Sequence, residues 1–389
     1  MSEPSPPERL NPILPFSLYE RGMREGRFIT PEMSILLDLV RGLAALVVLG
    51  GHMVQMGMYT GSYPLSQTAQ HNAVLIFFVL SGLVISHSVR SRPQDLRTYA
   101  IARAARILPV SAFALVLGYV LFTIARAEGL EAGHEHPHAR SADLTTLLLP
   151  VFFLSGSEGI ALPPWNPPYW SLGYEVWFYA LFGAAVFLHG KMRVLALVVL
   201  SLFAGWRVLL LLPSWLMGAW LAGKDFRPDR QAALALGLAG SLLMLGSSIY
   251  GTTAASWLVP VENAIDAHFS FSAYFLTDNL FAMGTAVIFV ALRPPAEAKA
   301  NLLQRWAGPI RWLAGCSFSL YILHWPIISF LSAFGYVAGD NVLLFAAYAF
   351  AVFAFCAWTA RFTEHRSGDI RKWMLRVTSR GRGEAVASA

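Results

Sequence analysis

The sequence predicts an all-α membrane protein, a polytopic bundle of about 10 transmembrane helices with one additional half-span or re-entrant segment. The chain has 389 residues, of which 56% are hydrophobic and only 13% are charged, and its mean hydropathy is +0.52. Its apolar windows are about 17–25 residues long, the length that crosses a hydrocarbon core of about 30 Å as a helix. They lack the residue-by-residue alternation of a transmembrane β-strand. A soluble domain is therefore excluded.

The apolar segments set the order of the predicted elements. Full spans are expected at 36–53, 72–89, 107–125, 171–188, 232–250, 269–292, 318–336 and 342–362. Two shorter spans with a tight turn are expected within 194–223, because Gly205, Arg207 and Pro213 interrupt that stretch. The segment 143–156 is too short to cross comfortably and leads into the run LPPWNPPYW, so it is interpreted as the half-span.

The basic residues predict how the chain is inserted. All but four of the 29 Lys and Arg residues fall on one side of these spans; the exceptions are Arg126 and Arg140 outside, and Arg41 and Arg207 within or near spans. The positive-inside rule then places an N-terminal tail (1–33) and a basic C-terminal tail (366–389) in the cytoplasm, around a membrane domain at 34–365. The expected location is a bacterial-type inner membrane. The net charge of +6 is scattered over short loops, which argues against a nucleic-acid partner.

The first apolar segment carries three ionisable groups, Asp38, Arg41 and His52. On a helix, the last two lie on one face and about 16 Å apart along the axis. Charged groups in a span are costly and usually face a cavity, a partner or a substrate path. A neutral imidazole there suits a general base for an alcohol. The alternative is structural, with Arg41 paired to Asp38 and His52 bonded to a neighbouring helix.

Arg103 and Arg106 occur three residues apart in YAIARAARILP and so share a helix face at the start of the third span. Paired guanidinium groups at a helix N-terminus suit phosphates, because their fork geometry, permanent charge and the helix dipole act together. They are candidates for holding an anionic donor at the inner face. Ordinary positive-inside charge is the alternative explanation.

Later segments supply further polar candidates. Glu175 in WSLGYEVWFYALF is the only carboxylate of its span and needs a partner, which Arg207 or His52 would supply. Structural pairing and catalytic orientation of Glu175 are both open. Tyr321 and His324 lie one turn apart in FSLYILHWPI, where substrate contact and a hydrogen-bonded place in the core are the two alternatives.

Two clusters in the connecting loops remain. Trp165 and Trp170 in LPPWNPPYW are candidates for stacking on an acceptor sugar, although Trp is equally typical of a membrane interface. His134, His136 and His138 alternate in GHEHPH, but this Pro-containing segment has an exposed character and no metal site is expected.

Five segments, taken in order, resemble the acyltransferase 3 family of integral membrane acyltransferases: DLVRGLAALVVLGGH, FFVLSGLVI, YAIARAARILP, WSLGYEVWFY and FSLYILHWP. Their order and spacing agree across residues 37–366. The resemblance implies about ten transmembrane helices, an acyl-CoA donor bound from the cytoplasm, and transfer of an acyl group, often acetyl, to a hydroxyl. Arg41 and His52 match the family's Arg and catalytic His, and Arg103 and Arg106 match its Arg pair at the donor entrance.

The resemblance also shows two departures. Glu175 matches the first carboxylate of the family's usual Glu-Glu pair, and Val176 replaces the second. Near the end of the chain, the family has Pro one or two residues after a Glu, whereas Glu364 is followed by His and Arg. Tyr321 and His324 fit the late motif.

The function expected from these observations is transfer of an acyl group, with acetyl first, from acyl-CoA to a carbohydrate-type acceptor such as a surface polysaccharide or a glycolipid. An antibiotic or lipid hydroxyl is the alternative acceptor. A transporter that uses Arg41, His52 and Glu175 as an ion or proton path is the alternative of another class. An inactive ligand-binding relative is the third possibility.

Overall fold

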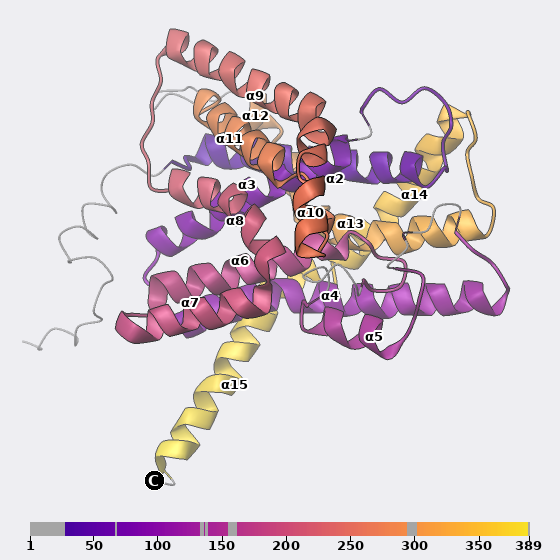
Figure 1. Ribbon diagram of the computed structural model, residues 1–389. Coiled ribbons are helices and arrows are strands. Elements are labelled where there is room, and N and C mark those ends of the chain that lie inside the picture. Colours follow the sequence, from indigo (N-terminus) through magenta and orange to yellow (C-terminus); the bar gives the residue numbers. More distant parts are fainter. Residues whose placement is uncertain are drawn as a thin grey trace, which may run out of the picture.

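The computed structural model describes residues 28–66, 68–132, 136, 139–154, 162–293 and 302–387. Within these residues the chain is helical and forms no β-strand, only an isolated bridge between Tyr59 and Gly339. Most of the long helices run roughly alongside one another in a bundle, and the last helix projects away from it (Figure 1). The predicted all-α helix bundle is confirmed.

The described helices, in chain order, are α2 (Pro31–Gln55), α3 (Ala69–Ser91), α4 (Leu96–Ala127), α5 (Leu144–Val151), α6 (Tyr169–Phe187), α7 (Gly190–Ala204), α8 (Trp206–Leu221), α9 (Arg230–Ser256), α10 (Val259–Ile265), η2 (Ser270–Ser272), α11 (Phe275–Ala291), α12 (Leu302–Arg305), α13 (Ala307–Ala333), α14 (Val342–Ala360), η3 (Glu364–Arg366) and α15 (Ser367–Ala387).

Six helices of the described chain are long and apolar enough to cross a membrane, and the bent pair α7 and α8 makes a seventh if it is one span. The count of ten crossings stays a prediction. The helices α6, α7, α8 and α11 have 15 to 19 residues. At 1.5 Å per residue they extend only about 22–29 Å, slightly less than a typical hydrocarbon core. The eight-residue α5 is too short to cross, as expected of the half-span.

Gly205 breaks the stretch between α7 and α8, as the sequence predicted, whereas Arg207 and Pro213 lie within α8 and do not end it. The φ of Gly205 is +80°, a conformation that glycine adopts without the steric penalty of a side chain. The two helices therefore meet at a bend of 115° instead of continuing as one.

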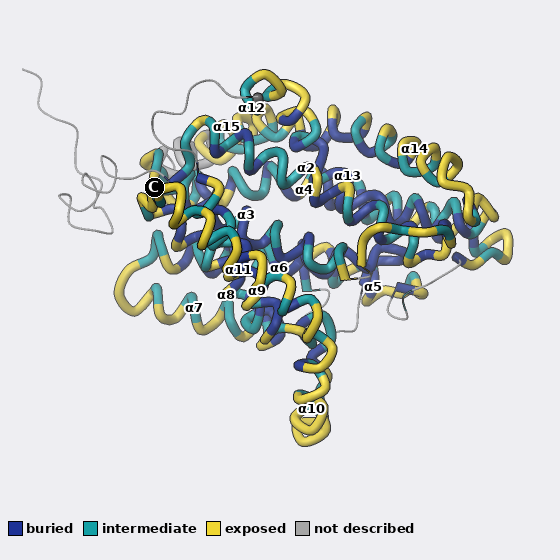
Figure 2. The backbone as a smooth tube through the Cα atoms, turned by 90° about the horizontal axis from the view of Figure 1, so that it is seen from above, coloured by how far each residue is buried: buried dark blue, intermediate teal, exposed yellow. Residues whose placement is uncertain are grey.

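The helices with little buried surface lie at the periphery. Figure 2 shows long exposed stretches on α9 and α14 around a buried interior that includes α13. On α9 the exposed apolar side chains recur every three or four residues, at Leu234, Leu238, Leu242, Leu245 and Ile249. One continuous apolar face of this kind is what a helix presents to lipid.

The start of α2 is held by a buried guanidinium group. Arg293, just after α11, donates from Nε to the carbonyl oxygen of Phe28 (3.1 Å) and from Nη1 to that of Phe226 (2.5 Å). It also forms an ion pair of 2.6 Å with Asp225. A hydrogen bond from Arg227 and the pairing with Arg293 hold the pKa of Asp225 below its ordinary value. Three chain segments are thereby joined where α2 begins.

The helices α3 and α8 approach each other closely through two glycines. A Cβ atom on Gly82 would lie 2.0 Å from the carbonyl oxygen of Trp215, and one on Gly218 would lie 1.9 Å from that of Val79. Both neighbours are backbone atoms, which a side-chain rotation cannot move aside. Glycine at both positions lets the helices touch, the usual way in which helices associate closely in a membrane.

We expect Gly82→Ala to destabilise the protein, because the new methyl group forces α3 and α8 apart. The expected loss is about 1–3 kcal/mol, as for other overpacked interiors. The matched control is Gly246→Ala on α9, where a Cβ atom meets nothing within 4 Å. Thermal unfolding of the purified protein in detergent measures both, and equal midpoints for the two variants would contradict the packing described.

Candidate active site

A cavity of about 240 Å³ lies between α2, α3, α4, α6 and α13. Its charged lining residues are Asp38, Arg41, Arg103, Arg106 and Glu175. The four candidate residues among them come from three separate sequence segments, and the fold brings them to one space together with Asp38. The prediction that Arg103 and Arg106 share a face is confirmed, since both line this cavity.

Arg41 lies on α2, where its Nη2 donates to Oδ1 of Asp38 at 3.0 Å, one turn earlier. This is the pairing that the spacing in the sequence suggested. The Nε atoms of Arg41 and Arg103 are buried and have no hydrogen-bond partner among the described residues. Buried donors of this kind are normally satisfied, so both guanidinium groups retain capacity for an anion.

Arg106 is paired with a carboxylate from the far end of the chain. Its Nη2 lies 3.6 Å from Oε1 of Glu364. The other oxygen of Glu364, Oε2, accepts from the backbone N (3.2 Å) and Oγ (3.3 Å) of Ser319 on α13. Glu364 is only 6% exposed, so it fixes Arg106 against α13. The sequence drew attention to this Glu only through the missing proline after it.

One part of the argument for the arginine pair is wrong. The helix α4 begins at Leu96, capped by the Asp95 side chain, which accepts from the N of Thr98 at 2.8 Å. Arg103 and Arg106 therefore lie about two and three turns into the helix. The field of a helix terminus falls off within the first turn, so the two guanidinium charges, and not the dipole, dominate here.

Glu175 accepts a short hydrogen bond from the hydroxyl of Tyr179, one turn later on α6. That hydroxyl also contacts Oγ of Ser81 at 2.9 Å. Neither predicted partner fills this role in the structure: His52 is bonded elsewhere, and Nε of Arg207 donates to the carbonyl oxygen of His268 at 2.6 Å. Glu175 thus belongs to the arginine-lined cavity and not to the surroundings of His52.

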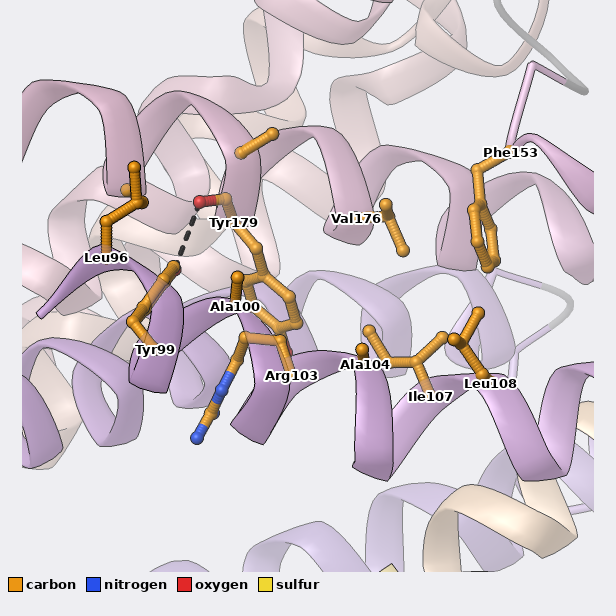
Figure 3. A pocket seen from close by; sticks show the side chains of 12 residues that line it. Leu96, Tyr99, Ala100, Arg103, Ala104, Ile107, Leu108, Phe153, Val176 and Tyr179 are labelled. Carbon is orange, nitrogen blue, oxygen red and sulfur yellow. Dashed lines mark hydrogen bonds between the residues drawn. The ribbon is translucent and has the colours of Figure 1, made fainter. Parts of the chain in front are cut away.

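Val176 lies in a second, apolar groove of about 260 Å³ between α4 and α6. Figure 3 shows Val176 beside Phe153, Ile107 and Leu108, while the guanidinium group of Arg103 points away from these side chains. A carboxylate at position 176 would lie in apolar surroundings, where a charge is costly. Valine suits this groove, which gives the departure at position 176 a physical reason.

His52 and His324 form a direct hydrogen bond across the bundle. The Nδ1 of His52 lies 2.7 Å from Nε2 of His324, and the two rings are nearly parallel, with an interplanar angle of 7°. The Trp325 ring meets His52 edge-on at 4.5 Å between centroids. On the other side of the pair, Nδ1 of His324 lies 3.0 Å from the carbonyl oxygen of Leu320.

Tyr321 connects the cavity with the histidine pair. It lines the cavity, and its ring lies 6.3 Å from that of His324, one turn later. Its hydroxyl is bonded to Oγ of Ser171 at 2.6 Å, and its ring meets Phe77 edge-on. Neither Ser171 nor Phe77 was singled out from the sequence, because nothing in a serine or phenylalanine of an apolar span marks it as special.

Trp165 and Trp170 do not line the cavity. They are 1% and 7% exposed, respectively. Trp165 meets Phe122 edge-on, and Trp170 stacks on Phe271 at 4.9 Å between centroids. The structure therefore gives neither ring a free face for an acceptor sugar.

The loop that carries Trp165 and leads into α6 has a clear role in packing. Pro326 inside α13 lacks the N–H that would bond to the carbonyl oxygen of Ile322. Nδ2 of Asn166 donates to that oxygen instead, at 3.0 Å. A Cβ atom on Gly118 of α4 would lie 2.8 Å from the carbonyl oxygen of Pro164, so the loop is also pressed against α4. The run LPPWNPPYW fills the space beside the proline of α13.

The described residues contain no group of three His, Cys, Asp or Glu side chains placed to hold a metal ion. Of the three histidines in GHEHPH, His134 and His138 lie outside the described residues, and the ring of His136 stacks on Phe271.

Fold and site together define a multi-pass helical membrane protein with a cationic cavity that ends near a hydrogen-bonded pair of imidazoles. Comparison with protein families gives the class: the acyltransferase 3 model, described as an acyltransferase domain, matches residues 35–361. The chain belongs to this family and is a membrane acyltransferase. No curated protein and no solved structure matches it. Glu364 lies just beyond the matched range.

We expect Asn166→Ala to destabilise the protein by about 1–3 kcal/mol, because the buried carbonyl oxygen of Ile322 loses its partner. The control is the same change in a Pro326→Ala background, where the new backbone N–H of residue 326 reaches that oxygen within the helix. A double-mutant cycle of unfolding measurements separates the two. The cost of Asn166→Ala should be smaller in the second background, and an equal cost would rule out the compensation.

Proposed function

We propose that this acyltransferase takes its acyl group from acyl-CoA, with acetyl-CoA the first donor, and transfers it to a hydroxyl of a carbohydrate-type acceptor. The observation that carries the proposal is the cavity lined by three guanidinium groups, which reaches towards the histidine pair at Tyr321. The donor combines several phosphates with a long flexible arm that ends in a thioester. An anion site with a reactive base close to one of its ends suits such a molecule.

The guanidinium groups of Arg41, Arg103 and Arg106 are proposed to bind the donor phosphates. Guanidinium groups match phosphate oxygens in geometry and stay charged at any physiological pH. The unpartnered buried Nε atoms of Arg41 and Arg103 support this role. Asp38 and Glu364 fix two of the three groups, so that a bound anion meets donors already oriented.

The proposed orientation places both chain termini in the cytoplasm of a bacterial-type inner membrane, as the distribution of Lys and Arg indicates. The start of α2 and the three arginines then lie towards the cytoplasm, and His52 lies deeper. Arg41 and His52 are on one unbroken helix, about 16 Å apart along its axis. A pantetheine arm extends over a comparable length, so a donor anchored at the arginines brings its thioester to His52.

His52 is proposed as the general base. It takes the proton of the acceptor hydroxyl while that oxygen attacks the thioester carbonyl carbon. The carbon–sulfur bond then breaks, and His52 returns the proton to the departing sulfur, so that the products are the acyl ester and free CoA. The other route is attack by His52 itself to give an acyl-imidazole that the acceptor then opens, and ping-pong kinetics would mark it.

Surface polysaccharide or glycolipid is the first class of acceptor to test, followed by an antibiotic or lipid hydroxyl. Since Trp165 and Trp170 are enclosed, they are not proposed as sugar contacts. Tyr321 is proposed to contact the donor, because it lines the cavity and its ring lies next to that of His324. Glu175 is proposed to orient Tyr179 in the same cavity and not to act on the acceptor.

We expect His52→Ala to bind acetyl-CoA with unchanged affinity and to lose turnover by about 100-fold or more, the usual contribution of a general base. The variant Arg103→Ala/Arg106→Ala should lose donor affinity. Release of free thiol measures turnover, and calorimetric titration measures binding.

The matched control for the arginine variant is Arg92→Ala/Lys191→Ala, which removes two exposed positive charges outside the cavity. It should bind acetyl-CoA as the unchanged protein does. If all of these proteins bind and turn over the donor alike, the proposed site is wrong. If none turns it over, yet the unchanged protein drives anion uptake into liposomes, the transporter interpretation takes its place.

A further inference from the structure

His324 is placed to act on His52 and not on a substrate. It is completely enclosed, with an exposed fraction of 0%, whereas His52 is only half-buried. The side chain of His324 has both ring nitrogens engaged, one by His52 and one by the carbonyl oxygen of Leu320. A group so enclosed has no free atom for an acyl donor or an acceptor.

The Leu320 contact determines where the protons lie. A carbonyl oxygen only accepts hydrogen bonds, so the proton of His324 must be on Nδ1. In the neutral ring, Nε2 of His324 is then an acceptor with a lone pair. The 2.7 Å contact with His52 therefore requires that Nδ1 of His52 carries the proton and donates it.

The alternative assignment needs a charged ring. If Nε2 of His324 were the donor, both its nitrogens would carry protons, and an enclosed imidazolium would have to exist without a counter-ion. The described residues form no ion pair with either ring, the His ion pairs being those of His71 and His268. A buried charge without a partner is costly, so the neutral arrangement is favoured.

We propose that His324 is a positioning residue that fixes the tautomer of His52, leaving the lone pair of its Nε2 free for the acyl-transfer reaction. In the described structure, Nε2 of His52 makes no hydrogen bond, as a reactive nitrogen requires. The neutral side chain of a free histidine prefers its proton on Nε2, which is the unreactive form for this role. The partner on the second ring nitrogen decides between the two forms. The edge of Trp325 holds the ring plane in place.

The hydrogen bond between His52 and His324 also stabilises His52 after it has accepted the proton. Once Nε2 of His52 has taken the acceptor proton, its ring is an imidazolium, and the bond from Nδ1 to the neutral His324 becomes charge-assisted and stronger. No covalent bond to His324 forms or breaks. This inference rests on the proposed function, because it assumes that His52 is the reactive group.

The test compares three substitutions at one position. His324→Gln can place its side-chain oxygen near the former Nε2 and accept from His52. His324→Asn is one methylene shorter, keeps a polar group near the Leu320 carbonyl oxygen, and does not reach His52. His324→Leu offers no acceptor at all. All are measured for acetyl-CoA turnover, for donor binding and for thermal unfolding.

We expect His324→Asn and His324→Leu to lower kcat by about 10- to 100-fold with the KM for acetyl-CoA unchanged, as for loss of an oriented base. His324→Gln should retain kcat within about fivefold, because the accepting atom is restored. If His324→Leu does not fold, the comparison of Gln with Asn still decides. Equal kcat for Gln and Asn would overturn the inference.

A direct reading of the tautomer completes the test. In protein with 15N-labelled histidine, the signals lost in His52→Ala identify His52, and we expect its Nδ1 to be protonated and its Nε2 not. Protonated Nε2 in the unchanged protein overturns the inference. If His52→Ala keeps full turnover, the proposed function is wrong. If His52→Ala is inactive but His324→Leu is fully active, only the proposed role of His324 in fixing the tautomer is wrong.

Discussion

The cost of charge in hydrocarbon constrains this structure more than any other single factor. Three guanidinium groups share a space inside a helix bundle, and each needs compensation. Arg41 is compensated by Asp38 one turn away, and Arg106 by Glu364. Arg103 lies over the aromatic rings of Tyr99 and Tyr179. The compensation is incomplete, since two buried Nε atoms lack partners in the described chain. The cavity therefore keeps a surplus of donors for an anion.

In the described part of the chain, the histidine pair lies in surroundings without charge, in contrast to the arginines. Around His52 and His324 the described structure has an indole ring and a backbone carbonyl oxygen but no charged partner. Neutral imidazoles survive in such surroundings, and their directional bonds fix which nitrogen carries a proton. Placing charge at one end of α2 and neutrality at the other lets one helix serve both an anion and a base. Tyr321 lies between the charged cavity and the neutral histidine pair.

The sequence predicted the elements well because they depend on local composition. The apolar helices, the break at Gly205 and the pairing of Arg41 with Asp38 all follow from residues within a few positions of one another. The contacts that complete the site join distant segments. His52 and His324 are 272 residues apart, and nothing local in either segment specifies the other. The partner of Glu175 was missed for a different reason: it was sought across the bundle, although Tyr179 lay one turn away on the same helix.

The aromatic and proline-rich run LPPWNPPYW shows how composition can mislead. Tryptophan beside proline is typical both of sugar-binding loops and of membrane interfaces, and here the cluster instead fills the gap beside Pro326. The amide side chain of this run, that of Asn166, donates its hydrogen bond to the backbone carbonyl oxygen of Ile322 in α13. Without the fold, an enclosed Trp165 cannot be told from an exposed one, because burial is a property of the neighbours.

The position of Glu364 bears on where the working unit of this protein ends. The family match stops at residue 361, at the close of α14, but the carboxylate that fixes Arg106 and binds Ser319 comes three residues later. A chain that ended at residue 361 would retain every helix of the cavity and lose one of its counter-charges. Chimeras and shortened forms for structural work should therefore have their junction or end beyond η3, so that Glu364 is kept together with Arg106.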